Sequence, residues 1–288
     1  MRARQPDAEG TIRRDGVEIF YEAYGARETT VLMLPTWSIL HSRCWKMQIP
    51  YLARYFRVVT FDPRGNGRSD RPAGPEAYGE REFASDALAV LDAAGAERAV
   101  LVGFSMGAQR SLLLAAEHPE RVAGAVFIGS AVPLAPAVPT ENWIDDFNLP
   151  RNFYEGWDKF NRHYWMSDYE DFLEFFYAEF YNQPHSTKQH EDAVAWGLQT
   201  DPETLVATQL GPRIDADELR VLAAQVGCPV LIIHGTADAI RPYQSGAAFA
   251  DLLGAALVLL EGSGHAPHAR DPVKVNLLIK QFADQVAA

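Results

Sequence analysis

The chain of 288 residues contains only two cysteines, Cys44 and Cys228. Two cysteines are too few for a disulfide framework and lack the spacing of metal ligands, so we expect reduced thiols in a cytosolic protein. Neither a His-Glu-x-x-His motif nor a Cys-x-x-Cys pair is present, and four histidines are scattered along the chain: His41, His163, His185 and His190. The sequence therefore predicts neither a metal site nor a metal cofactor.

The chain also lacks long apolar runs and has few basic residues. No segment reaches about 18 uninterrupted apolar residues, and residues 1–7 are too charged for a secretion signal. The 26 basic residues face 38 acidic ones, which gives a formal net charge of −12. This excess argues against binding to nucleic acid or anionic membranes, and mildly against strongly anionic substrates. We expect a soluble cytoplasmic enzyme, a monomer or homodimer, that acts on neutral or cationic small molecules without a cofactor.

Short apolar runs rich in Val, Ile and Leu alternate with helical patterns through most of the chain. The predicted strands are 17–24 (an edge strand), 30–34, 57–61, 99–104, 122–128, 229–233 and 256–260. The predicted helices are 44–54, 80–94, 106–118, 243–253 and 271–287. This alternation predicts an α/β fold with a mostly parallel sheet of about eight strands, flanked by helices on both sides. Such sheets bind ligands at the carboxyl ends of their strands.

The alternation stops between residues 131 and 211, where no strand is predicted. Residues 143–181 hold 15 of the 32 aromatic residues and are also acidic. Four phenylalanines in this segment recur at helical spacing: Phe172, Phe175, Phe176 and Phe180. We therefore predict a core formed by residues 1–130 and 213–288, with residues 131–212 as a helical, aromatic-rich insertion after the sixth strand.

The sequence Gly-Phe-Ser-Met-Gly at 103–107 lies between a predicted strand and a predicted helix. A serine that projects from such a turn takes a strained backbone conformation, and side chains two positions away on either side would clash. Gly103 and Gly107 remove that clash. Ser105 is therefore predicted to be a nucleophile, although the pentapeptide alone is a weak signal that also fits a plain turn.

A serine hydroxyl needs a base to remove its proton and an acid to orient that base. Asp238 follows the strand 229–233, and His265 follows the strand 256–260, so both are expected at the same edge of the sheet as Ser105. Other interpretations stay open. Asp238 could cap a following helix, His265 could be a buried structural histidine with His268 as the base, and Asp62 could be the acid.

Four motifs together resemble the α/β-hydrolase superfamily. They are Gly-Phe-Ser-Met-Gly at 103–107, His-Gly-Thr-Ala-Asp at 234–238, Gly-Ser-Gly-His-Ala-Pro at 262–267 and Asp-Pro-Arg-Gly-Asn-Gly-Arg-Ser at 62–69. The resemblance covers nearly all of the chain outside the insertion. It implies Ser105 as nucleophile, His265 as general acid and base, Asp238 as orienting carboxylate, and the insertion as a helical cap.

The oxyanion hole is where the sequence departs from this family. The family usually has His-Gly after its third strand, whereas this chain has Pro35 and Thr36. By position, the backbone N–H groups of Trp37 and Met106 are expected to bind the oxyanion. Proline at 35 and the lack of glycine at 36 restrict this loop.

The aromatic cap predicts large, flat, apolar walls over the serine, which favours hydrophobic or aryl substrates. The residues predicted to touch substrate are Trp143, Trp157, Trp165 and Phe176. We expect a serine esterase that forms an acyl-enzyme. A lactonase, a carbon–carbon bond hydrolase or a cofactor-free perhydrolase would use the same residues, and a ligand-binding or partner module is the alternative of another class. Dehalogenase and epoxide hydrolase chemistry is excluded, because those relatives need a carboxylate in place of Ser105.

Overall fold

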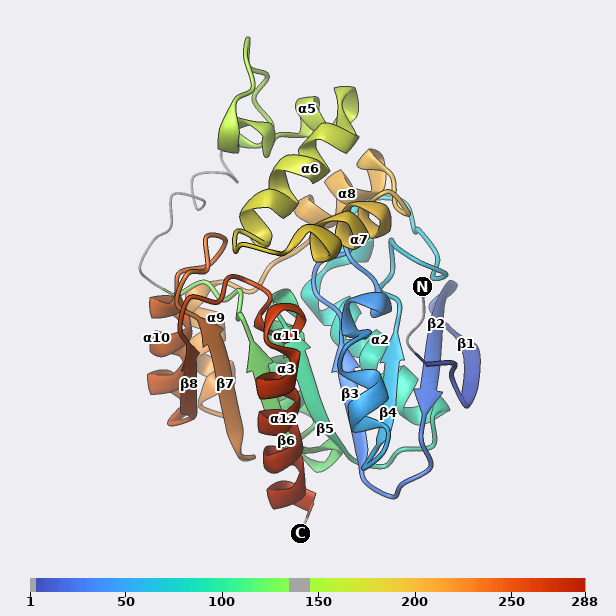
Figure 1. Cartoon of the computed structure of the whole chain (residues 1–288). Coiled ribbons are helices and arrows are strands. Elements are labelled where there is room, and N and C mark those ends of the chain that lie inside the picture. The colour runs from blue at the N-terminus through green and yellow to red at the C-terminus, as the bar shows by residue number, and fades with distance from the viewer. Residues whose placement is uncertain (1–3, 135–145, 288) are drawn as a thin grey trace.

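An eight-stranded sheet forms the centre of the computed structural model, which describes residues 4–134 and 146–287 (Figure 1). Its strands are β1 (Ala8–Arg14), β2 (Val17–Tyr24), β3 (Thr30–Leu34), β4 (Arg57–Phe61), β5 (Ala99–Phe104), β6 (Val122–Ile128), β7 (Val230–Gly235) and β8 (Ala256–Leu260). They lie in the order β1-β2-β4-β3-β5-β6-β7-β8. β1 pairs antiparallel with β2 and β2 with β4, and the remaining pairs are parallel. The predicted mostly parallel α/β sheet is thus confirmed.

The central strands are apolar because both faces of the sheet are covered. Every residue of β3 and β5 is buried. Successive residues of β3 point to opposite faces, so that Val31 and Met33 join one apolar cluster while Leu32 and Leu34 join the other. β2 was predicted to be an edge strand, but it is not at the edge. All of β1 pairs with β2, so β1 forms the edge of the sheet instead. β1 is mostly polar and exposed, so its sequence carries little strand pattern.

Helices cover both faces of the sheet. On one face the apolar cluster includes residues of α2 (Glu80–Ala93), α3 (Met106–Glu117), α9 (Ala216–Ala223) and α10 (Tyr243–Leu253). On the other face it includes residues of α1 (Ile49–Leu52) and α12 (Pro272–Ala287). The short elements are η1 (Ser42–Trp45), η2 (Pro75–Tyr78), η3 (Pro119–Arg121) and α11 (Pro267–Arg270). Within the described ranges, no helix combines the length and hydropathy that crossing a membrane requires.

The helix predicted over 44–54 is wrong in its extent. The chain instead forms η1, which ends at Trp45, and then the separate helix α1, which begins at Ile49. Pro50 lies in the first turn of α1, where its missing N–H costs nothing, but in the middle of a continuous helix it would clash with the preceding turn. Residues 216–223 form α9, which periodicity did not reveal.

The described part of the segment after β6 is helical and lies above the carboxyl edge of the sheet in Figure 1. It contains η4 (Gly156–Lys159), α5 (Arg162–Ser167), α6 (Tyr169–Phe180), α7 (Thr187–Gly197) and α8 (Pro202–Leu210). Two hydrogen bonds join these helices to the loop after β3. Tyr177 donates its hydroxyl to the Ile39 carbonyl at 3.0 Å, and the Trp37 indole donates to the Thr208 hydroxyl at 2.6 Å. The aromatic helices are therefore held directly over that loop.

Candidate active site

Ser105 lies on the sharp turn between β5 and α3. Its φ of +54° is in the region that favours glycine, so the turn is strained. A Cβ on Gly103 would lie 2.4 Å from the Gly107 carbonyl oxygen, and a Cβ on Gly107 would lie 2.8 Å from the Pro35 carbonyl oxygen. Neither position has room for a side chain. The two glycines thus allow α3 to pack tightly behind the serine.

The structure brings Ser105 together with His265 and Asp238. The Ser105 hydroxyl and the His265 Nε2 are 3.0 Å apart, and the His265 Nδ1 lies 2.8 Å from Asp238 Oδ2. All three side chains are at least nine-tenths buried. They meet because each follows the carboxyl end of a parallel strand, β5, β7 or β8, and those ends share one edge of the sheet. The arrangement orients the imidazole so that Nε2 faces the serine.

The Asp238 carboxylate is held at both of its oxygens. Oδ1 accepts the backbone N–H groups of Ile240 and Arg241, each at 2.8 Å. Oδ2 accepts from His265 and also from His234 Nε2 at 3.0 Å. Burial opposes ionisation, but the charge of His265 and the hydrogen bonds from both histidines outweigh it and lower the pKa of Asp238 below its ordinary value. The role of His234 was missed, although the residue stands near the end of a predicted buried strand.

His268, the alternative base, and Asp62, the alternative acid, are not part of the hydrogen-bonded chain from Ser105 to Asp238. His268 packs against Phe104 and Trp45, with ring centroids 4.4 Å and 4.9 Å away, and burial together with the charge of His265 lowers its pKa to about 3. Asp62 instead binds the Ser42 hydroxyl at 2.6 Å and the Arg68 backbone N–H at 2.9 Å. The hydrogen bonds of Asp62 thus close the turn that carries it and join that turn to η1.

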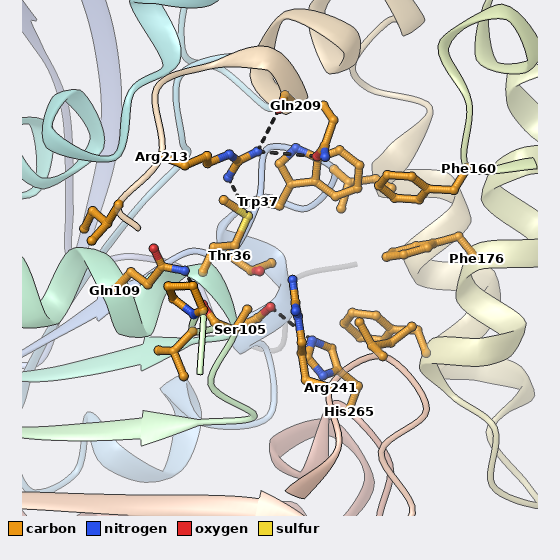
Figure 2. Close-up of a pocket in the computed structure, with 18 residues that line it drawn as sticks. Thr36, Trp37, Ser105, Gln109, Phe160, Phe176, Gln209, Arg213, Arg241 and His265 are labelled. Atoms are coloured by element: carbon orange, nitrogen blue, oxygen red, sulfur yellow. Dashed lines mark hydrogen bonds between the residues drawn. The ribbon is translucent and has the colours of Figure 1, made fainter. Parts of the chain in front are cut away.

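A pocket of about 270 Å³ opens at the Ser105 hydroxyl (Figure 2). Four aromatic rings that line it form the aromatic wall: Trp37, Phe160, Phe176 and Phe180. Trp37 comes from the loop after β3, and Phe176 and Phe180 come from α6, so segments far apart in the chain form one apolar surface. Such a wall suits a small substrate with an apolar or aryl group.

The predicted substrate-contacting aromatics have different positions. Phe176 lines the pocket, as Figure 2 shows. Trp165 is fully buried behind the wall, where its ring packs against Trp37 with centroids 5.6 Å apart, so that it supports the wall without lining it. Trp157 packs edge-on against Phe175 and likewise does not line the pocket. Trp143 lies outside the described residues. Helical spacing alone could not distinguish these rings, because it does not tell which side of a helix faces the cavity.

Trp37 and Met106, the two residues expected to supply the oxyanion hole, line the same pocket as Ser105. The Thr36 carbonyl accepts a hydrogen bond at 2.7 Å from the guanidinium of buried Arg110. In a trans peptide the C=O and the following N–H point in opposite directions, so the Trp37 N–H faces away from Arg110. Arg110 therefore sets the direction of that peptide, a role that the sequence did not reveal.

Polar groups also line the pocket, among them Gln209, Arg213 and Arg241 (Figure 2). None of these was predicted, because their positions depend on how α8 and the loop after β7 meet. Among the described residues, no group of three or more His, Cys, Asp or Glu side chains is arranged to hold a metal ion.

Comparison with known proteins identifies the family. A family model described as alpha/beta hydrolase fold matches residues 29–272. A bifunctional esterase/perhydrolase from Acinetobacter calcoaceticus is 28% identical over 252 residues, which cover 83% of this chain and 86% of that protein. Among solved structures, an esterase from Exiguobacterium antarcticum has a TM-score of 0.81 at 22% identity, covering 94% and 97% of the two chains. The enol-lactonase from Burkholderia xenovorans LB400 has a TM-score of 0.78 at 23% identity, covering 95% and 99%. The chain belongs to the alpha/beta hydrolase fold family.

Proposed function

We propose that the protein is a serine hydrolase that cleaves carboxylic esters of small hydrophobic or aryl substrates through an acyl-enzyme. Family membership supports a hydrolase, and the esterase activity named for the Acinetobacter relative supports ester substrates. The observation that carries the proposal is the continuous hydrogen-bonded chain from Ser105 through His265 to Asp238 at the mouth of an apolar pocket.

In the acylation step, the Ser105 hydroxyl attacks the carbonyl carbon of the ester while His265 Nε2 takes its proton. Asp238 stabilises the imidazolium that results, and its fixed position keeps the Nδ1 proton of His265 in place. The tetrahedral intermediate then collapses, and His265 returns the proton to the departing alcohol oxygen. The acyl group remains bonded to Ser105 as an ester.

Deacylation repeats these transfers with water. His265 takes a proton from a water molecule, whose oxygen attacks the acyl carbon, and then returns that proton to the Ser105 oxygen as the acid leaves. The free enzyme is regenerated without a cofactor or metal. Hydrolysis is thus divided into two steps that one histidine serves in both directions.

The negative charge that develops on the carbonyl oxygen needs donors, and we assign the backbone N–H groups of Trp37 and Met106 to this role. Support comes from Arg110, whose guanidinium holds the Thr36 carbonyl and so directs the Trp37 N–H away from Arg110. Arg110 also pairs with Glu80 at 2.9 Å and lies 3.6 Å from the Phe83 ring centroid. In this chain the contacts of Arg110 hold the loop in one conformation, although Thr36 stands where the family usually has a glycine.

In this proposal, residues 131–212 act as a cap that selects the substrate. The aromatic wall supplies flat apolar surface within reach of the serine, and Phe176 contacts the bound group. Trp165 and Trp157 pack behind the wall and keep its rings in position.

The test is a time course of 4-nitrophenyl ester cleavage, from acetate to decanoate together with an aryl ester. The purified protein is compared with Ser105→Ala. We expect turnover of the wild type and a loss of at least about 10³-fold in the variant, because the nucleophile is removed. Turnover that survives the substitution, or none in the wild type, would contradict the proposed function and favour carbon–carbon cleavage or a ligand-binding role.

A further inference from the structure

Gln209 brings an amide group from the helical segment to the active-site pocket. It lies in the last turn of α8 and lines the same pocket as Ser105 and His265 (Figure 2). The preceding residue, Thr208, accepts the hydrogen bond of the Trp37 indole, which joins the end of α8 to the aromatic wall. The amide of Gln209 is therefore placed where the end of α8 meets that wall.

Arg213 holds both the main chain and the side chain of Gln209. Its Nη2 donates to the carbonyl oxygens of Thr208 and Gln209 at 2.9 Å and 3.3 Å, and such carbonyls at the end of a helix have no partner within it. The same Nη2 lies 3.4 Å from Gln209 Oε1. Nη1 donates to Glu80 Oε1 at 2.9 Å, which anchors the guanidinium. Arg213 is thus engaged at both terminal nitrogens and fixes the position of Gln209.

This contact also decides which end of the Gln209 amide faces the guanidinium. A guanidinium only donates hydrogen bonds, so it must face the amide oxygen and not the amide nitrogen. Nε2 is then turned away from Arg213, and in Figure 2 the side chain points toward the pocket between Arg213 and Phe160. Among the residues that the structure describes, none accepts a hydrogen bond from Nε2. Its N–H groups are therefore available to a bound molecule.

We propose that the substrate carries an uncharged carbonyl oxygen in its acyl group, in addition to the scissile ester, and that Gln209 Nε2 donates a hydrogen bond to this oxygen. The aromatic wall holds the apolar part. An uncharged acceptor is inferred because the donor is a neutral amide and both terminal nitrogens of Arg213 are engaged. The acyl group is the part assigned because it stays bonded to Ser105 between the two steps. The inference rests on the proposed serine hydrolase function and adds a substrate class to it.

The test uses three pairs of esters of nearly equal shape. One member of each pair is the 4-nitrophenyl ester of 4-oxopentanoic, 5-oxohexanoic or 6-oxoheptanoic acid. In the other member a methylidene group replaces the ketone oxygen, so the pair differs in the acceptor while the leaving group is the same. The ratio of kcat/KM between the two members is the ketone preference, and its change from wild type to variant is the readout. The greater hydrophobicity of the methylidene ester cancels from that change.

Two variants separate hydrogen-bond donation from support of Arg213. Gln209→Glu keeps the shape of the side chain and an oxygen for Arg213 but has no N–H group at pH 8. Gln209→Met has neither the oxygen nor the N–H group. We expect both variants to lower the ketone preference about three- to tenfold in at least one pair, mainly through KM, which is the usual contribution of one neutral hydrogen bond. If Gln209 acted only by holding Arg213, Gln209→Glu would keep the preference of the wild type.

The matched control is Gln281→Met, which removes the amide of an exposed glutamine on α12. It should leave the ketone preference within about twofold of the wild type in all three pairs. A preference that is unchanged in Gln209→Glu for every pair, or that falls as far in Gln281→Met, overturns the assignment of Gln209.

Failure of the proposed function is distinguished by binding. If the wild type cleaves none of the six esters, the hydrolase proposal fails, and calorimetric titration of these esters into the wild type and Gln209→Glu then decides the second question. Selective loss of affinity for a ketone ester in Gln209→Glu supports the assigned hydrogen bond. Equal affinity of both proteins for every ketone ester overturns it.

Discussion

The strand-end loops and the aromatic wall depend on the sequence in different ways. Ser105, Asp238 and His265 each follow a strand of the parallel sheet, so the topology alone brings them to one edge. The wall instead combines a ring from the loop after β3 with rings from the helical segment, and these meet only through tertiary packing. Chemistry that is set by local motifs can therefore stay constant while the wall changes what is bound.

Arg110 connects the two regions. It lies on α3, the helix after Ser105, and binds the loop that carries Trp37, a ring of the aromatic wall. Arg110→Met removes the hydrogen bond to the Thr36 carbonyl, so the Trp37 N–H loses its fixed direction. In the proposed mechanism this N–H is one of the two oxyanion donors. Loss of one such donor costs about 10²–10³ in rate, so we expect kcat to fall about 10²-fold with KM within about threefold. Steady-state kinetics on the best 4-nitrophenyl ester measures both.

Arg64→Met is the control for a merely structural effect. Arg64 is equally buried, and its guanidinium pairs with Asp86 without reaching the Thr36 loop. Both variants should unfold at lower urea concentration, whereas only Arg110→Met should lose kcat. A similar loss of kcat in both variants would assign Arg110 to stability alone.

His268 sharpens the comparison within the strand-end loops, since it lies three residues after His265 but has a different environment. Its pKa falls from 6.5 to about 3, so between these pH values the unfolded chain binds a proton that the folded protein does not. The contribution of His268 to the stability of the wild type therefore becomes less favourable as the pH falls below 6.5. His268→Phe removes this pH-dependent loss of stability. The change in the free energy of unfolding caused by the substitution should therefore be about 2 kcal/mol more favourable at pH 5 than at pH 8.

Urea unfolding of the wild type and His268→Phe at both pH values measures this difference. Any steric cost of the larger ring beside Phe104 and Trp45 is the same at both pH values and cancels. Parallel pH dependence in the two proteins would sink the idea that His268 stays neutral when the protein is folded.

Much of the fold was predictable because its signals are local. The buried strands are short apolar runs, and the turn at Ser105 demands glycine at both Gly103 and Gly107. β1 was missed because its residues are mostly polar and show no apolar pattern. It is a strand mainly because it pairs with β2. The close approach of Ser105, His265 and Asp238 followed from the topology, and their catalytic roles stay a prediction.

The pocket was less predictable because its walls depend on packing between distant segments. Periodicity placed Phe176 on a helix but could not show that Phe160 lines the cavity while Trp165 lies behind it. Arg241 stands only three residues after Asp238, yet its side-chain direction depends on the loop that follows β7.

Phe176→Leu gives the smallest expected effect and tests the wall alone. Phe176 lines the pocket and contacts Phe160, whereas its neighbour Phe175 packs against Trp157 outside it. An aromatic pair contributes about 0.5–1.5 kcal/mol beyond its buried area. Phe176→Leu should therefore lower kcat/KM for an aryl ester about three- to tenfold relative to acetate, and the control Phe175→Leu should not. Equal shifts in both variants would mean that α6 affects selectivity through its general packing, so that no single ring of the wall recognises the substrate.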